Sequence, residues 1–547
     1  MWQWIRNGTP WIWLTGGAVS FSLLSVLGLL LLIGWKGLTY FWPSPLTLWQ
    51  VEDSNRQIVG QIYRSEDVAA ESLRLFRNLP EYRDDDQIQR LHIKVANRDI
   101  YPSDFIALLN IELSAPAYPT GWAVIERVRH GQFFAKPIAY QDGNETEAGH
   151  LPSVLTKAVD EADEVNDQID ALIADKIQVI SHDLELLRLE KRRKELNSQI
   201  DDDYLLSYQA RFNELHDKSN ASEAELNDLK AHLKQKQIIV EDMYGERYTI
   251  PLADVIDIWF PNDMGMLEKT GHWLAQVWHF MADSPRESNS EGGVFPAIFG
   301  TVLLVILMAI IVMPLGVISA VYLHEYAKDN AVTRIIRVAV INLAGVPSIV
   351  YGVFGLGFFV YNIGSSIDEL FYSERLPSPT FGTPGLLWSA LTLAVLTLPV
   401  VIVATEEGLT RIPVSVRHGS LALGATQSET IWRIVLPMAS PAIITGLILA
   451  IARAAGEVAP LMLVGVAKLV SSLPVDMEFP YLHLDRKFMH LGFHIYDVGF
   501  QTSNIEAARP LVYATSFLLV AVIVALNLTA IRIRNNLREK YKTMGLD

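Results

Sequence analysis

The chain is 547 residues long, half of its residues are hydrophobic, and this length leaves room for a membrane domain and one soluble domain. The formal net charge of -16 is uneven, because residues 51–292 carry 45 acidic and 26 basic side chains while the rest carries 16 acidic and 19 basic ones. Neither part is strongly basic, which argues against nucleic acid as a partner, and the absence of cysteine excludes disulfides and thiol chemistry.

The N-terminal segment predicts a membrane anchor. Residues 11–35 form an uncharged apolar run, and a spanning helix needs about 20 such residues. The stretch 29–36 lacks the small-x-small exit of a cleaved signal peptide. We therefore expect a retained helix within residues 1–40, with tryptophans at its ends in the membrane interface.

Residues 41–292 predict an acidic insertion that begins with a β-containing module. Short β-like runs occupy 58–63, 91–96, 123–127 and 132–135, and His130-Gly131 separates the last two. Tyr244-Gly245-Glu246 marks a later hairpin, after which 250–260 leads back toward the membrane.

About residues 153–240 of this insertion predict a coiled-coil hairpin. Apolar residues recur every three or four positions from Leu155 to Leu187 among dense charges, as in an amphipathic helix. At 1.5 Å per residue, this helix would reach on the order of 50 Å. Residues 217–221 are expected to break the helix, and Ser222 with Glu225 to cap a return helix.

Five further apolar runs predict five more spans in a core of residues 293–547. They cover about 294–321, 336–361, 386–405, 442–466 and 511–531. Basic residues follow the second, fourth and sixth spans, and short cytoplasmic loops are typically basic. We therefore expect an α-helical polytopic membrane protein with both termini in the cytoplasm and the insertion outside.

Counting the N-terminal anchor as the first of six predicted spans, a polar helix hairpin at 415–437 separates the fourth (386–405) from the fifth (442–466). Its first half is compatible with a helix, Thr426 and Glu429 form a capping box for a second helix, and Leu436-Pro437 is expected to stop that helix. The hairpin is too polar to cross a bilayer. Its apolar residues, which are too many for a free loop, are Leu421, Leu423, Ile431, Trp432, Ile434 and Val435. We therefore expect the hairpin to dock against a binding surface rather than lie free.

The spacing from Gly424 through nine residues to Ile434-Val435-Leu436-Pro437 resembles the cytoplasmic coupling motif of binding-protein-dependent ABC importer permeases. In this chain His418-Gly419-Ser420 replaces the usual E-A-A. The strings 342–352 and 452–460 are similar to those of phosphate importer permeases of the PstA type. The resemblance covers most of residues 293–547 but not the insertion, and it implies the six-helix permease fold.

The resemblance also implies partners and a location. It implies a heterodimer with a second permease subunit in the lipid of a bacterial inner membrane, two ATPase subunits that bind ATP and Mg, and a periplasmic phosphate-binding protein. The chain itself would hold no cofactor. The residues expected to couple it to the ATPase are His418, Leu421, Gly424, Ala425, Ile431, Trp432, Leu436 and Pro437. At Gly424, a missing side chain would permit a close approach.

Two ionisable residues lie in the predicted fifth span, 442–466. Arg453 and Glu457 are four residues apart, which places them on one helical face. Ionisable residues at membrane depth usually face a polar interior and mark a substrate path. Arg453 would offer a bidentate fork to an oxyanion, and Glu457 would hold or compete for that fork. The alternative is a staple between helices without substrate contact.

Glycines and Pro347 crowd the third run, where they favour a pore wall with Ser348 and Tyr351 as its polar faces. Helix packing alone is the alternative for each residue. The carboxylates at the inner helix ends, namely Glu325, Glu406 and Glu407, are expected to be solvated.

His490 and His494 have the i, i+4 spacing of metal ligands but no third candidate nearby, so we expect a packed or solvated surface and no metal.

The sequence contains no G-x-x-x-x-G-K-[ST] phosphate loop, so a separate ATPase chain would supply the energy and this chain would be a transport subunit rather than an enzyme. The favoured function is import of inorganic phosphate. The acidic insertion would repel that anion, and we expect it to make protein contacts or act as a spacer. Two alternatives stay open: a permease for sulfate or molybdate, and a membrane-anchored coiled-coil sensor or scaffold, which would need neither intramembrane charge nor a docking hairpin.

Overall fold

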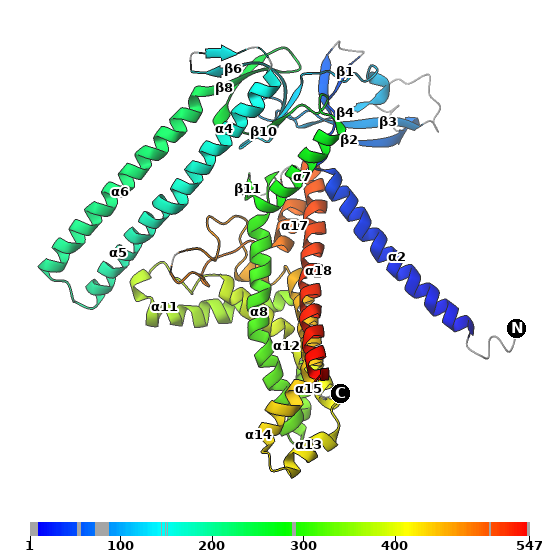
Figure 1. Ribbon diagram of the computed structural model, residues 1–547, viewed down its shortest axis with the longest axis vertical. Coiled ribbons are helices and arrows are strands. Elements are labelled where there is room, and N and C mark those ends of the chain that lie inside the picture. The colour runs from blue at the N-terminus through cyan, green and yellow to red at the C-terminus, as the bar shows by residue number, and fades with distance from the viewer. Residues whose placement is uncertain are drawn as a thin grey trace. The chain divides into compact units, whose positions relative to one another are not determined.

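The computed structural model describes residues 9–51, 56–71, 87–143, 145–147, 149, 151–286, 291–477, 479–502 and 505–543. It divides into two compact units, Met1–Tyr40 with Trp278–Asp547 and Phe41–Val277. Each unit has its own hydrophobic core, and Figure 1 labels the elements.

The described residues of the unit Phe41–Val277 form two antiparallel sheets. One has the order β1-β2-β3-β4, and the other has the order β10-β5-β6-β8-β9 with β7 paired to β6. The strands are β1 (Thr47–Gln50), β2 (Gln57–Ala69), β3 (Gln87–Lys94), β4 (Phe105–Leu109), β5 (Ala123–Arg127), β6 (Gln132–Asp142), β7 (Glu145–Glu147), β8 (Lys236–Glu241), β9 (Arg247–Pro251) and β10 (Val255–Trp259). The four predicted strands are present as β2, β3, β5 and β6.

Strands β5 and β6 lie between two apolar cores, because successive side chains of a strand point to opposite faces. Ile125 and Phe133 belong to one core, which the base of the long hairpin also joins. Val124 and Phe134 belong to the other, which includes residues of β1, β2 and β3. The turns at His130-Gly131 and Gly245 adopt positive φ, as tight hairpin turns require.

A long helical hairpin extends from the second sheet. Helix α4 (Leu151–Leu172) continues through a π-helical segment (Ile173–Ile177) into α5 (Gln178–Leu196), and α6 (Asp202–Gln235) returns beside it (Figure 1). The outgoing helix is therefore about 70 Å long, more than the sequence suggested. The chain reverses where Ser198 has a φ of 54°, and the Asp201 carboxylate then caps α6 by accepting from the Tyr204 N–H at 2.8 Å.

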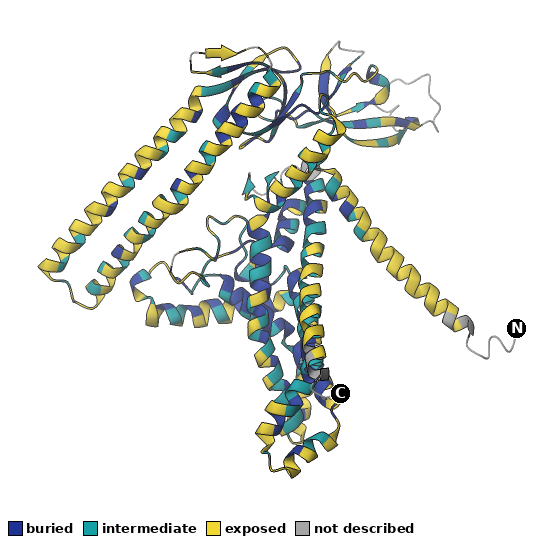
Figure 2. Ribbon diagram, in the orientation of Figure 1, coloured by how far each residue is buried: buried dark blue, intermediate teal, exposed yellow. Residues whose placement is uncertain are grey.

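The predicted break at 217–221 is wrong, because α6 runs through it without interruption. The segment contains neither glycine nor proline, and its serine and asparagine cost a helix only a few tenths of a kcal/mol each. Ser222 is buried within the helix instead of capping it. Beyond a buried base that includes Leu155, Ala162 and Leu233, most of the hairpin is exposed (Figure 2).

Six helices among the described residues are long and apolar enough to cross a membrane. They are Trp13–Thr39, Phe295–Tyr326, Ser348–Phe371, Leu386–Thr410, Gln427–Gly456 and Ala508–Asn536. Three spans are single helices, namely α2 (Thr9–Thr39), α12 (Leu386–Thr410) and α18 (Ile505–Thr543). The second span is α8 (Phe295–Val321) with a π-helical end (Tyr322–Tyr326), and the third is α10 (Ser348–Phe354), a π-helical segment (Gly355–Gly364) and α11 (Ser365–Phe371). The fifth is α14 (Gln427–Thr430), a π-helical segment (Ile431–Val435) and α15 (Leu436–Gly456). Shorter helices are α7 (Met266–Ala282), α9 (Ala331–Leu343), α13 (Val414–Ala422), α16 (Leu461–Val464) and α17 (Leu491–Phe500), and β11 (Pro285–Arg286) pairs with β12 (Glu291–Gly292).

Helix α12 is the most buried of these candidate spans, with 67% of its most apolar window inside the structure. Glycines on its neighbours and on itself bring the backbones together. A Cβ at Gly316 would lie 2.6 Å from Val401 Cγ1, and one at Gly408 would lie 2.4 Å from Ala442 Cβ. Small residues at such crossings are typical of packed membrane helices.

Two predicted spans have different bounds. The third does not begin at 336, because the amphipathic helix α9 ends at Leu343 and a turn that includes Gly345 and Pro347 precedes α10. The fifth does not extend to 466, because α15 ends at Gly456. It begins instead at Gln427, inside the hairpin that was expected to lie outside the membrane helices.

Candidate functional site

The first helix of the hairpin at 415–437, α13, ends in a Schellman turn. The Gly424 N–H donates to the Leu421 carbonyl at 3.0 Å, and the Ala425 N–H donates to the Ser420 carbonyl at 3.3 Å. Gly424 has a φ of +91°, and a Cβ there would meet nothing within 4 Å. Within this chain glycine serves the left-handed backbone conformation, and a close approach by a partner stays a prediction.

The second helix begins as predicted but does not stop. Thr426 and Glu429 form the capping box, with the Glu429 carboxylate accepting from the Thr426 N–H at 3.0 Å. The helix then continues through the π-helical segment into α15, so the predicted stop at Leu436-Pro437 is wrong. Proline lacks an N–H, and its ring crowds the preceding turn. The wider π-helical segment, whose last bond joins the Leu436 N–H to the Ile431 carbonyl, precedes Pro437 directly and accommodates its ring.

One face of the hairpin exposes large apolar side chains. Leu423 is 91% exposed, Trp432 is 66% exposed, and Val414 and Leu421 are also exposed. His418 is exposed and Ala425 is half-buried. Ile431 is only 2% exposed, so the expectation that it docks outward is wrong. The buried hydroxyls of Ser420 and Thr430, 2.8 Å apart, hold the two short helices together.

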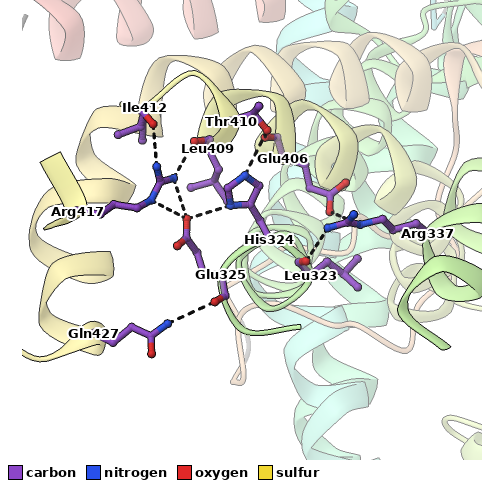
Figure 3. Close-up of polar contacts among 10 residues, drawn as sticks. All are labelled: Leu323, His324, Glu325, Arg337, Glu406, Leu409, Thr410, Ile412, Arg417 and Gln427. Carbon is purple, nitrogen blue, oxygen red and sulfur yellow. Dashed lines mark hydrogen bonds and ion pairs between the residues drawn. The ribbon is translucent and has the colours of Figure 1, made fainter. Parts of the chain in front are cut away.

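Behind this face lies a group of polar residues that we call the Glu325 cluster (Figure 3). Its side chains are His324, Glu325, Arg337, Glu406, Thr410, Arg417 and Gln427. Arg417 of α13 donates to Glu325 Oε1 at 2.8 Å from Nη2 and 3.2 Å from Nε. It also donates to the carbonyls of Leu409 at 2.9 Å and Ile412 at 2.7 Å.

The remaining contacts extend the Glu325 cluster to neighbouring helices. His324 Nδ1 lies 3.0 Å from Glu325 Oε1, and its Nε2 lies 3.3 Å from Thr410 Oγ1. Arg337 of α9 donates to the Leu323 carbonyl at 2.8 Å and lies 3.6 Å from Glu406 Oε1. The prediction that the inner carboxylates are solvated is wrong for Glu325 and Glu406.

Glu407 is exposed, as predicted. The sequence singled out Glu325 and Arg417 separately, as an inner carboxylate and as a basic loop residue. Their pairing joins positions 92 residues apart, and no local spacing signals it.

The predicted substrate-path residues gather near the C-terminal end of α15. Arg453 Nε lies 3.6 Å from Glu457 Oε1, and both side chains are half-buried. Because α15 ends at Gly456 and Glu457 has an extended backbone, the pair spans the helix end. The two side chains face one another at the i, i+4 spacing, and their role in a substrate path stays a prediction.

Tyr351 and Ser348 come from α10, which packs against the segment after Glu457. A Cβ at Gly352 would lie 2.7 Å from Pro460 Cα. The Tyr351 hydroxyl donates to the Leu343 carbonyl at 2.6 Å, bridging the turn between α9 and α10. Ser348 is half-buried at the first turn of α10. The Tyr351 proton is thus already engaged, and this hydroxyl offers lone pairs rather than a donor.

His490 and His494 are buried at the start of α17, so the packed alternative is correct for them. Burial lowers the pKa of both imidazoles to about 4, which keeps them neutral near pH 7. Among the described residues, no group of three or more His, Asp or Glu is arranged to hold a metal ion.

These features define a multi-pass membrane protein in which a helical hairpin with exposed apolar side chains joins the fourth candidate span to the start of the fifth. Residues 312–542 match the family described as binding-protein-dependent transport system inner membrane component. The phosphate transport system permease protein PstA 1 of Mycobacterium tuberculosis (strain CDC 1551 / Oshkosh) is 35% identical over 287 residues, which cover 52% of this chain and 83% of the relative. The probable ABC transporter permease protein YqgI of Bacillus subtilis is 32% identical over 46% of this chain and 81% of the relative.

Among solved structures, the MetNI methionine ABC transporter is similar at 18% identity with a TM-score of 0.32, covering 45% of this chain and 94% of the other. The chain belongs to the family of binding-protein-dependent transport system inner membrane components. The region of similarity to PstA 1 covers about half of the present chain.

Proposed function

We propose that the chain is the permease subunit of an ATP-driven importer that moves inorganic phosphate across the inner membrane. The observation that carries this proposal is the 35% identity to PstA 1 over 83% of that relative's length. A second relative, from Methanocaldococcus jannaschii, is also named as a probable phosphate transport system permease protein, with 32% identity over 55% of its length.

The substrate path would pass the end of α15. A guanidinium can bind two oxygens of a tetrahedral anion at once. In the structure Arg453 is held by Glu457 at 3.6 Å, a separation longer than a good hydrogen bond. Glu457 would therefore restrain Arg453 between transport events and release its fork when phosphate arrives. Ser348 and Tyr351 would line the path beside them.

The exposed face of the hairpin at 415–437 would dock into an ATPase subunit. Exposed apolar residues at this density favour a protein contact over open solvent. Leu421 and Trp432 would provide most of the contact, with His418 and Ala425 at its margin. Gly424, Ile431, Leu436 and Pro437 would act indirectly, by shaping the turn and the helix that carry this face.

The complete importer would contain a second permease subunit, two ATPase subunits with ATP and Mg, and a periplasmic phosphate-binding protein. Basic residues at the predicted inner loops, such as Arg411 and Arg417, favour cytoplasmic termini. Residues 1–40 would then anchor the chain, 41–292 would be periplasmic, and 293–547 would be the transport core.

The test is uptake of labelled phosphate by vesicles that contain the whole importer. We expect ATP-dependent uptake of labelled phosphate. An excess of unlabelled phosphate should suppress this uptake, and the same concentration of sulfate or molybdate should not. Suppression by sulfate or molybdate alone would assign the permease to that oxyanion. Absence of uptake of all three anions by an assembled complex would favour the sensor or scaffold alternative.

A further inference from the structure

We propose that Arg417 is a positioning residue that fastens the docking hairpin to the inner end of the second span, so that motion imposed on the hairpin reaches that span directly. This inference rests on the proposed transport function, and it concerns how the same hairpin is regulated. The link is the contact of Arg417 with Glu325, at the core of the Glu325 cluster (Figure 3).

The chain itself connects the hairpin to only two spans. Helix α12 leads into α13 through residues 411–413, and α14 continues into α15. The second span, made of α8 and its π-helical end, lies far away in sequence, and the paired positions 325 and 417 are 92 residues apart. Without a side-chain link, the hairpin could move while the end of this span stayed in place.

Arg417 makes that link with all three of its guanidinium nitrogens. Nε and Nη2 bind Glu325 at the end of the second span, and Nη2 and Nη1 also bind the Leu409 and Ile412 carbonyls at the end of α12. A cation at this position is also favoured by the dipole of α12. One side chain of α13 thus holds the ends of two spans at once.

Burial gives the Arg417–Glu325 contact strength. The side chains are 14% and 11% exposed, so solvent screens their attraction poorly. Removing one partner leaves a largely buried charge uncompensated, which is strongly unfavourable. The Gln427 side chain adds a bond of 3.3 Å from α14 to the Glu325 carbonyl. Both short helices of the hairpin therefore contact the same residue of the second span.

On α13, the exposed docking residue Leu421 lies one helical turn beyond Arg417. Leu421 and Leu423 are exposed, whereas Arg417 is largely buried. A partner that displaces Leu421 would therefore displace Arg417 with it. Because packed elements move as bodies rather than deforming continuously, the displacement would reach α8 through Glu325.

The experiment measures phosphate taken up per ATP hydrolysed by the reconstituted importer carrying Arg417→Met, Glu325→Gln or both. Arg417→Met keeps the length of the stem and removes the donors and charge, and Glu325→Gln keeps the shape and removes the charge. We expect each single change to lower this ratio by at least about fivefold while hydrolysis continues, a typical size for coupling between sites. The double variant should be no worse than the worse single variant, because both changes break one contact. Arg417→Lys should fall between the parent and Arg417→Met.

Arg334→Met is the matched control, because Arg334 is 73% exposed and Asp329, with which it forms an ion pair at 3.8 Å, is 85% exposed. Its ratio should equal that of the parent. An unchanged ratio in both single variants, or multiplied losses in the double variant, would overturn the inference. If Arg417→Met does not assemble, Glu325→Gln decides by the same ratio.

The measurement uses whichever anion the parent transports. If the parent transports another anion, the proposed substrate is wrong, but the ratio still tests the contact between Arg417 and Glu325.

Discussion

Gly424 adopts a left-handed backbone conformation, which costs a residue with a Cβ roughly 1–2 kcal/mol. Space is not limiting, since a Cβ there would meet nothing within 4 Å. We expect Gly424→Ala and Gly424→Leu to lower the thermal stability of the chain by similar amounts, and both to lower uptake per ATP by loosening the turn. His418→Ala, at an exposed position of the same helix, should change neither quantity appreciably.

Melting temperatures and coupling ratios of the three variants distinguish two roles for this glycine. If Gly424→Leu lowers uptake per ATP far more than Gly424→Ala does, a partner closes around the turn in the assembled importer. Similar losses support the backbone role.

Arg453→Ala should reduce phosphate uptake by about tenfold or more, because charge-assisted bidentate contacts to an oxyanion are among the stronger polar interactions. The change also removes the partner of Glu457, which could lower stability instead. Glu457→Gln and the double variant Arg453→Ala/Glu457→Gln separate these effects when uptake is divided by the amount of assembled complex. Parental uptake by Arg453→Ala would leave only the stapling role for this pair.

Residue roles were predictable from sequence where the determinants are local. The capping box of Thr426 and Glu429 depends on spacing within one turn, and the structure contains it. The contact between Arg417 and Glu325 depends on how two spans pack, and no local pattern in the sequence encodes that packing. Charges near helix ends therefore looked solvated when they were in fact paired.

The long hairpin of α4, α5 and α6 offers a test at the scale of an element. Its base packs on the second sheet through residues such as Leu155 and Leu233, whereas most of its distal part is exposed. The pair Lys176–Glu225, at 2.7 Å, marks matching positions on the two helices. Replacing residues 180–221 by a short glycine-containing turn should therefore leave the soluble unit folded and uptake within about twofold of the parent, a range typical of changes away from the site.

Uptake by this shortened chain, normalised to assembled complex, is the measurement. A matched deletion that also removes 155–179 and 222–233 should prevent folding of the unit, because it removes part of the buried core. Loss of uptake by the shortened chain at normal assembly would show that the distal hairpin takes part in transport.

Element boundaries followed the sequence only where strong breakers stand alone. Glycine and proline between α9 and α10 do break the third apolar run, although the sequence suggested one span across them. Pro437 does not break its helix, because the adjacent π-helical segment makes room for the ring. Asn220 and Ser222 do not break α6, because weak helix formers are tolerated within a long helix.

At the scale of the whole molecule, the absence of cysteine makes the orientation testable with single introduced thiols. Ala224 lies at an exposed position of the long hairpin of α4, α5 and α6, and Ser428 lies at an exposed position of the hairpin at 415–437. Each is replaced by cysteine. In intact spheroplasts, a membrane-impermeant maleimide should label Ala224→Cys and leave Ser428→Cys unlabelled until the membrane is opened. The opposite pattern would reverse the orientation and remove the docking hairpin from the side where ATP is hydrolysed.

The most direct test of the proposed function is the ATP hydrolysis rate of the reconstituted importer, with its binding protein, as each anion is added in turn. We predict that phosphate stimulates hydrolysis and that sulfate and molybdate at the same concentration do not. Stimulation by sulfate or molybdate without stimulation by phosphate would contradict it.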